Sequence, residues 1–90
     1  MQIRFYRDPE TGLPHIDAHG VSEAEAEWVL AHPGEDEACS GVSRQALGQT
    51  ANGRYLRIIY VPDEEGDGVF VETAYPQLKA FRRRQRRRGR

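Results

Sequence analysis

Two histidines four residues apart are the side chains of this chain best suited to chemistry. They are His15 and His19, in the stretch "HIDAH". On a helix both imidazoles would point the same way, as the histidine pairs of zinc sites do. A third ligand such as Asp17 would lie on another side of such a helix, and the chain has no second pair of His or Cys residues. We therefore predict no metal and no cofactor. Imidazoles titrate near neutral pH, which makes His19 a candidate general acid or base; the alternative is two histidines that only pack.

Arginines and tyrosines alternate along the middle and the end of the chain. Arginine binds phosphate and tyrosine stacks on unpaired bases, so this composition is typical of an RNA-binding surface. The alternative is a solvent-exposed face whose charges protect the edges of a sheet. The candidate RNA-binding residues are Arg44, Tyr60 and Tyr75, and the candidate phosphate-holding residues are Arg54 and Arg57.

The last ten residues, "FRRRQRRRGR", include seven arginines. Residues 79–90 hold eight of the 13 basic residues and none of the 14 acids, so they carry +8 while residues 1–78 carry −9. The stretch "RRRQRRR" resembles arginine-rich RNA-binding peptides, and the alternative is that it neutralises the acidic body. We expect both in alternation, because exposed ion pairs contribute only about 0–1 kcal/mol each. The candidate RNA contacts are Arg82, Arg83, Arg84, Arg86, Arg87 and Arg88.

Composition and length indicate one small domain. The chain has 90 residues, of which 38% are hydrophobic, and no apolar run approaches the roughly 20 residues of a membrane span. Its start has no apolar segment typical of a secretory signal. The lone Cys39 permits no internal disulfide. We therefore expect a cytoplasmic protein without membrane contact; the sequence leaves its oligomeric state open.

Four runs of the sequence are typical of strands. They cover residues 3–7, 43–50, 54–61 and 69–75, with turn signals such as "DPETG" and "ANG" between them. The polar stretch "GEDEACSG" is predicted to be a loop. The acidic stretch "DEEGD" is predicted to be a solvated hairpin loop rather than a cation site, because it lacks the ligand spacing of a calcium loop. Short links between the last three runs favour an antiparallel meander.

One helix is predicted with defined ends. Ser22 and Glu25 form the sequence pattern of a capping box, and the helix is expected to stop at "PG", which begins at Pro33. Trp28 is expected to pack this helix on the sheet. The preceding "HIDAHG" is either irregular or a helical turn that ends at Gly20, since glycine adopts the left-handed conformation that follows many helices.

A second helix is predicted at the end of the chain. Pro76 suits its first turn, and Leu78 and Phe81 are spaced to dock on the sheet. The element order is then β-α-β-β-β-α, which indicates an α+β domain with an antiparallel sheet of about four strands. We expect one domain over residues 1–81 and an arginine-rich extension over residues 82–90.

Three phrases of the sequence, in their order and spacing, resemble a known family. They are "HGVSEAEAEWVL", "GQTANGRYLRIIYV" and "VFVETAYP", followed by arginines, and together they span about residues 15–88. In this pattern the chain is similar to the BrnT-like toxin proteins of the RelE superfamily and their small uncharacterised relatives. The resemblance implies a compact α+β fold, with helices packed on an antiparallel sheet.

The same resemblance implies a ribonuclease toxin that a cognate antitoxin protein neutralises. In such chemistry a base activates the ribose 2′-hydroxyl, cations stabilise the charged phosphorane and an acid protonates the leaving oxygen. His19 matches the histidine of the family's "KHGVS" motif, but Ala18 stands where the lysine is expected, and Tyr75 stands where toxins often carry arginine. The resemblance thus implies RNA cleavage by His19, Arg54 and Arg57. The alternatives are a non-catalytic relative that binds protein or RNA through its tail and, last, a zinc protein.

Overall fold

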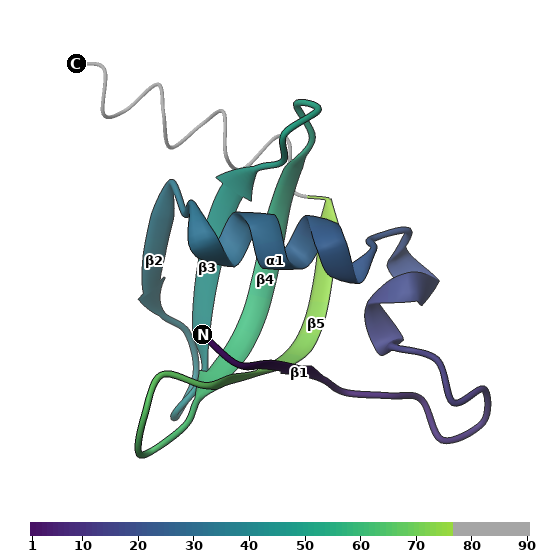
Figure 1. The fold of residues 1–90 in the computed structure, drawn as a ribbon, viewed down its shortest axis with the longest axis horizontal. Coiled ribbons are helices and arrows are strands. Elements are labelled where there is room, and N and C mark those ends of the chain that lie inside the picture. Colours follow the sequence, from purple (N-terminus) through teal and green to yellow (C-terminus); the bar gives the residue numbers. More distant parts are fainter. Residues whose placement is uncertain (77–90) are drawn as a thin grey trace.

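The computed structural model describes residues 1–76, which form a five-stranded sheet with a helix across one face (Figure 1). The predicted C-terminal helix and the arginine-rich extension lie outside the described residues. No helix within residues 1–76 is long and apolar enough to cross a membrane. The α+β class is confirmed. In chain order the elements are β1 (Ile3–Phe5), η1 (His15–His19), α1 (Glu23–Ala31), β2 (Glu35–Ala38), β3 (Arg44–Gln49), β4 (Tyr55–Pro62) and β5 (Val69–Pro76).

The sheet is mixed, with the strand order β1-β5-β4-β3-β2. Strands β3 to β5 form the expected antiparallel meander, and β2 extends it by one antiparallel strand. The prediction of about four antiparallel strands was wrong in two details. The first strand joins the far edge of the sheet and runs parallel to β5, with Ile3 opposite Val69. The acidic stretch at residues 35–38 was predicted as a loop but forms strand β2, which brings the number of strands to five.

Strand β2 forms although three of its four residues are acidic. Its neighbour β3 supplies the compensating donors: Arg44 Nε lies 2.8 Å from Asp36 Oδ1, and Gln45 Nε2 lies 2.7 Å from Glu37 Oε1. Charges on an edge strand also discourage pairing with another chain. The polar composition of residues 35–38 therefore predicted a loop, because the strand they form is stabilised by contacts with β3.

Helix α1 begins at the predicted capping box. The Glu25 amide donates to Ser22 Oγ at 3.1 Å, and the Ser22 amide donates to Glu25 Oε1 at 3.1 Å. Two amides that the first helical turn leaves unpaired are satisfied in this way. The helix ends at Ala31, with His32 as its C-cap, just before Pro33. The predicted boundaries of this helix are confirmed.

The core lies between α1 and the sheet, and Trp28 is not part of it. The buried positions of α1 are Ala26, Val29 and Leu30, at the spacing of one helical stripe. Trp28 lies beside this stripe, is 43% exposed and stacks on His32 with ring centroids 4.2 Å apart. The predicted role of Trp28 was therefore wrong. The helix crosses β3 closely at Gly48, where an added Cβ would lie 3.0 Å from Val29 Cγ1, so no large side chain fits between them.

We expect core and surface substitutions to separate sharply in stability. Ile58 is fully buried, so Ile58→Ala should lower the free energy of unfolding by about 2–5 kcal/mol. Trp28→Ala should cost less than about 1 kcal/mol, because its ring is exposed. Chemical denaturation followed by circular dichroism measures both variants. Equal losses would show that Trp28 contributes to the core after all.

Candidate functional site

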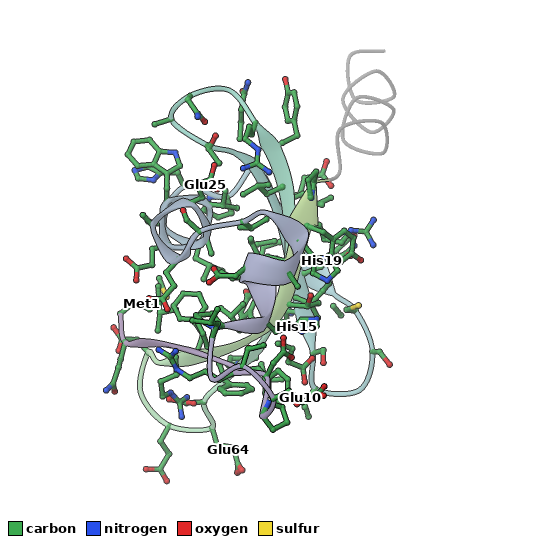
Figure 2. All side chains as sticks on the ribbon, turned by 90° about the vertical axis from the view of Figure 1, so that its right-hand side faces the viewer. Met1, Glu10, His15, His19, Glu25 and Glu64 are labelled. Carbon is green, nitrogen blue, oxygen red and sulfur yellow. The ribbon has the colours of Figure 1, made fainter. Side chains whose placement is uncertain are left out.

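The short helix η1 places both histidines beside the second half of β5. Strand β1 covers only the first half of β5, and η1 packs along the remainder (Figures 1 and 2). Ile16 anchors η1 in the core with 1% exposure, and Gly20 ends it in the left-handed conformation at φ 74°. The helical turn that the sequence left open is therefore present, as a 3₁₀ helix, and its anchoring fixes the histidines against the sheet.

Four side chains form a continuous row from η1 onto the sheet. We call His15, His19, Tyr75 and Arg57 the histidine–arginine row. Ring centroids of His15 and His19 lie 5.1 Å apart, and those of His19 and Tyr75 lie 5.9 Å apart. The Arg57 guanidinium carbon lies 5.8 Å from the centroid of the Tyr75 ring. Two of the predicted catalytic residues, His19 and Arg57, are thus joined through a predicted RNA-binding residue, Tyr75.

Strand register explains why the row lies on the face of the sheet away from α1. Arg57 pairs directly with Tyr75, so both side chains leave the sheet on the same side. Their neighbours Leu56 and Ile58 point to the opposite side, where α1 buries them completely. The row therefore borders a face that α1 does not cover.

An aspartate that the sequence analysis did not select orients His15. Asp8 Oδ1 lies 2.9 Å from His15 Nδ1, and both side chains are about one-third exposed. A carboxylate only accepts hydrogen bonds, so this contact favours a proton on Nδ1, the tautomer in which Nε2 of an uncharged imidazole is an acceptor. The pair lies seven residues apart across a turn that the Arg7–Pro14 bridge closes. No local motif marks such a contact, and the spacing of the histidines indicated only His15 itself.

Arg57 lies partly inside the protein, against the ring of Tyr75. It is half-buried, and its Nε is buried without a hydrogen-bond partner within the part of the chain that the structure describes. A guanidinium held over an aromatic ring is also attracted by the negative face of the ring. The guanidinium is thus positioned against Tyr75, with its Nε turned away from solvent.

Arg54, the other predicted phosphate-holding residue, is engaged elsewhere. Its Nη1 donates to Glu25 Oε2 at 2.9 Å and to the Gly20 carbonyl oxygen at 3.1 Å. Gly20 ends η1 and Glu25 belongs to the capping box of α1, so Arg54 ties the β3–β4 hairpin to the junction between the two helices. These contacts give Arg54 a structural role, and its phosphate-binding role stays a prediction.

Glu25 is held ionised by the same contacts. Burial opposes ionisation, but hydrogen bonding from the Ser22 amide and the charge of Arg54 outweigh it and lower the pKa of the Glu25 carboxyl. The pKa of Glu25 is lower in the folded than in the unfolded chain, so its ionised form stabilises the fold. This stabilisation is complete above about pH 4.5, the ordinary pKa of a glutamate, and it is lost as the pH falls through the pKa of the folded chain.

Glu25→Gln should therefore be destabilising near neutral pH but not in acid. Glutamine keeps the capping box but loses the ion pair with Arg54, so the expected loss is about 1 kcal/mol at pH 7. The difference from the parent should shrink below about pH 4.5. Urea denaturation at several pH values measures it, with the exposed Glu27→Gln as the control. A loss that does not change with pH would exclude the ion pair as its cause.

Arg44 and Tyr60 lie on the helix side of the sheet, away from the row. Arg44 pairs with Tyr60 in the sheet, and both contact the Asp36 carboxylate. Tyr60 is only 7% exposed, and burial, followed by the hydrogen bond to Asp36, raises the pKa of its phenol. Their RNA-binding roles stay predictions, but this arrangement leaves Tyr60 no open ring face for a base.

The described residues hold no metal-binding cluster: no three His, Cys, Asp or Glu side chains within residues 1–76 are grouped to hold an ion. Two acids of the "DEEGD" loop instead face positive groups. Asp63 pairs with Arg4, and Asp67 lies 3.4 Å from the amino terminus. The predicted RNA contacts from Arg82 to Arg88 lie outside the described residues.

Comparison with known proteins found no matching family model, no similar curated protein and no similar solved structure. The resemblance to the BrnT-like toxins therefore stays a prediction from the three sequence phrases.

Proposed function

We propose that this protein is a toxin-type endoribonuclease that cleaves RNA without a metal ion. The observation that carries the proposal is the histidine–arginine row: two imidazoles in contact, one of them hydrogen-bonded to a carboxylate, and an arginine that reaches them through the Tyr75 ring. Acid, base and phosphate-binding cation are the groups that this reaction requires.

Both histidines and Arg57 have a role in this reaction. His15, whose Nε2 is left as an acceptor by the Asp8 contact, removes the proton of the ribose 2′-hydroxyl. The 2′-oxygen then bonds to phosphorus, and the P–O5′ bond breaks. His19, exposed and adjacent, donates a proton to the departing 5′-oxygen, and Arg57 stabilises the charge of the phosphorane. The products are a 2′,3′-cyclic phosphate and a 5′-hydroxyl.

Arg57 supports this proposal in spite of the two departures from the family pattern. Ala18 and Tyr75 each replace an expected cation. Since Arg57 lies over the Tyr75 ring, a guanidinium is present next to the position that lacks arginine. Arg57 is then the one cation of the row beside the phosphate, whereas the family's sequence pattern has several. We therefore expect cleavage to be slow.

The distribution of charge along the chain favours a second function, in which the protein binds RNA or another protein without cleaving RNA. Residues 1–78 carry −9 and repel RNA, so affinity would come chiefly from the arginines of residues 79–90. The cognate antitoxin stays a proposal of the same kind. A small DNA-binding protein encoded beside this one would support the toxin function, and no such neighbour is needed by the alternative.

Histidine NMR signals test whether RNA occupies the row. The chain has three histidines, and His32 lies apart from the row, with its Nδ1 3.0 Å from the Trp28 carbonyl oxygen. A short 2′-O-methyl RNA, which cannot be cleaved, should shift the ring signals of His15 and His19 and leave those of His32 in place. Equal shifts at all three, or none, would remove the row from the RNA site.

A further inference from the structure

A hollow of about 270 Å³ opens directly beside the row. It is lined by Tyr6, His15, Phe70 and Glu72. His15 belongs to both the hollow and the row, so a group in the hollow lies next to the proposed base. Tyr6 is 43% exposed and meets His15 edge-on, with ring centroids 6.0 Å apart. The proposed function assigns no role to the other three residues.

The backbone fixes the aromatic walls of this hollow. The Tyr6 amide donates to the Val71 carbonyl oxygen at 2.9 Å, and the His15 amide donates to the Tyr6 carbonyl oxygen at 2.8 Å. Tyr6 thus continues the pairing of β1 with β5 and connects it to η1. Phe70 pairs with Val61 on β4, on the face away from α1, and the Arg4 guanidinium lies 6.0 Å from its ring centroid.

A bulge in β5 places the carboxylate. Ile59 pairs with Thr73 and Tyr60 pairs with Val71, so Glu72 is the extra residue. Bulges change the direction of side chains and are common next to active sites. Glu72 is exposed, and its Oε1 accepts from Ser43 Oγ at 3.3 Å. One oxygen is thereby held, while no hydrogen bond within residues 1–76 is shown for the other.

We propose that this hollow binds a guanine base of the RNA substrate. Unpaired bases in RNA sites stack on aromatic rings and are read along their Watson–Crick edge. An ionised carboxylate only accepts hydrogen bonds. Guanine is the one standard base whose Watson–Crick edge presents two adjacent donors, N1–H and N2–H, which match the two oxygens of Glu72. The other bases present an acceptor next to each donor.

The inference rests on the proposed function and deepens it. A guanine between Tyr6 and Phe70 would place its own ribose beside His15, because His15 forms one wall of the hollow. The following phosphate would then lie toward His19 and Arg57. Glu72 is a specificity-determining residue in this arrangement, and cleavage is expected next to guanosine.

Binding of non-cleavable RNA tests the hollow separately from cleavage. The probes are 2′-O-methyl oligouridylates with a single central guanosine, inosine or adenosine, measured with the full chain by fluorescence anisotropy. We expect guanosine to bind on the order of ten-fold tighter than adenosine, as for other paired contacts to a base edge. Inosine lacks the N2 donor and should lose most of that advantage.

Glu72→Gln is the decisive variant, because glutamine has the same shape but one acceptor fewer. It should abolish the guanosine preference and leave the adenosine affinity within about two-fold. Glu64→Gln removes the same charge from the acidic loop, where Figure 2 labels Glu64, and should keep the preference. Equal affinities of the parent for the three probes, or an undiminished preference in Glu72→Gln, would overturn the guanine site. A preference without any cleavage would keep the site and refute the nuclease.

Discussion

Replacing His19 with alanine is expected to lower the rate of RNA cleavage by about 10²–10⁴-fold, the usual contribution of a positioned acid or base. His19 is exposed at the end of η1 and lies between His15 and Tyr75 in the row. Its removal leaves the core intact, because Ile16 and not His19 anchors η1. The loss should therefore appear in the rate and not in the stability. Single-turnover cleavage of a short RNA with one guanosine, together with thermal unfolding, measures both.

His32→Ala is the matched control for this variant. It removes the same side chain from the end of α1, where His32 stacks on Trp28 and contacts no residue of the row. Cleavage by this variant should match that of the parent. If His19→Ala and His32→Ala cleave RNA equally well, the histidine–arginine row is not the active site and the activity arises elsewhere.

Removal of residues 82–90 is expected to lower RNA affinity by at least about 10³-fold at about 50 mM salt, because it deletes seven arginines. Affinity of the full chain should fall about 10³-fold between about 50 and 200 mM salt, while that of the truncated chain should change far less. The truncated chain should still fold, since the deleted segment contains no apolar residue. Fluorescence anisotropy with a short RNA at two salt concentrations tests this.

Two length-matched variants separate charge from chain length. Glutamine in place of the six arginines between residues 82 and 88 should reproduce the truncation, whereas lysine should retain most of the affinity, because phosphate attraction dominates. Equal RNA binding by the full and truncated chains would refute the RNA role of the tail. Unfolding of the truncated chain would show instead that the arginines chiefly neutralise the acidic body.

Local signals predicted the parts of the fold that depend on neighbours in sequence. The capping box of Ser22 and Glu25 is present because both partners lie within one helical turn. The burial of Leu56 and Ile58 follows from the alternation along one strand. The prediction placed Trp28 in the core because it shares a helical stripe with Ala24 and Ala31. The neighbouring stripe, which contains Val29, faces the sheet instead, so Trp28 stays at the surface.

Contacts between distant segments could not be predicted in this way. The acidic sequence of β2 does not indicate a strand by itself. The parallel pairing of β1 with β5 joins segments at opposite ends of the described residues, so no local pattern predicts it. In the candidate site, the histidine spacing indicated one half of the row. The contact of Asp8 with His15 and the bulge at Glu72 depend on a closed turn and on strand register, which composition does not encode.

The chemical nature of the RNA ends is the measurement that tests the central claim most directly. Purified protein is incubated with RNA in excess EDTA, and the new ends are identified by their reactivity and by mass spectrometry. Acid–base cleavage by the histidine–arginine row predicts 2′,3′-cyclic phosphate and 5′-hydroxyl ends, formed at the same rate with and without EDTA. Intact RNA, or 3′-hydroxyl and 5′-phosphate ends whose formation EDTA abolishes, would contradict it.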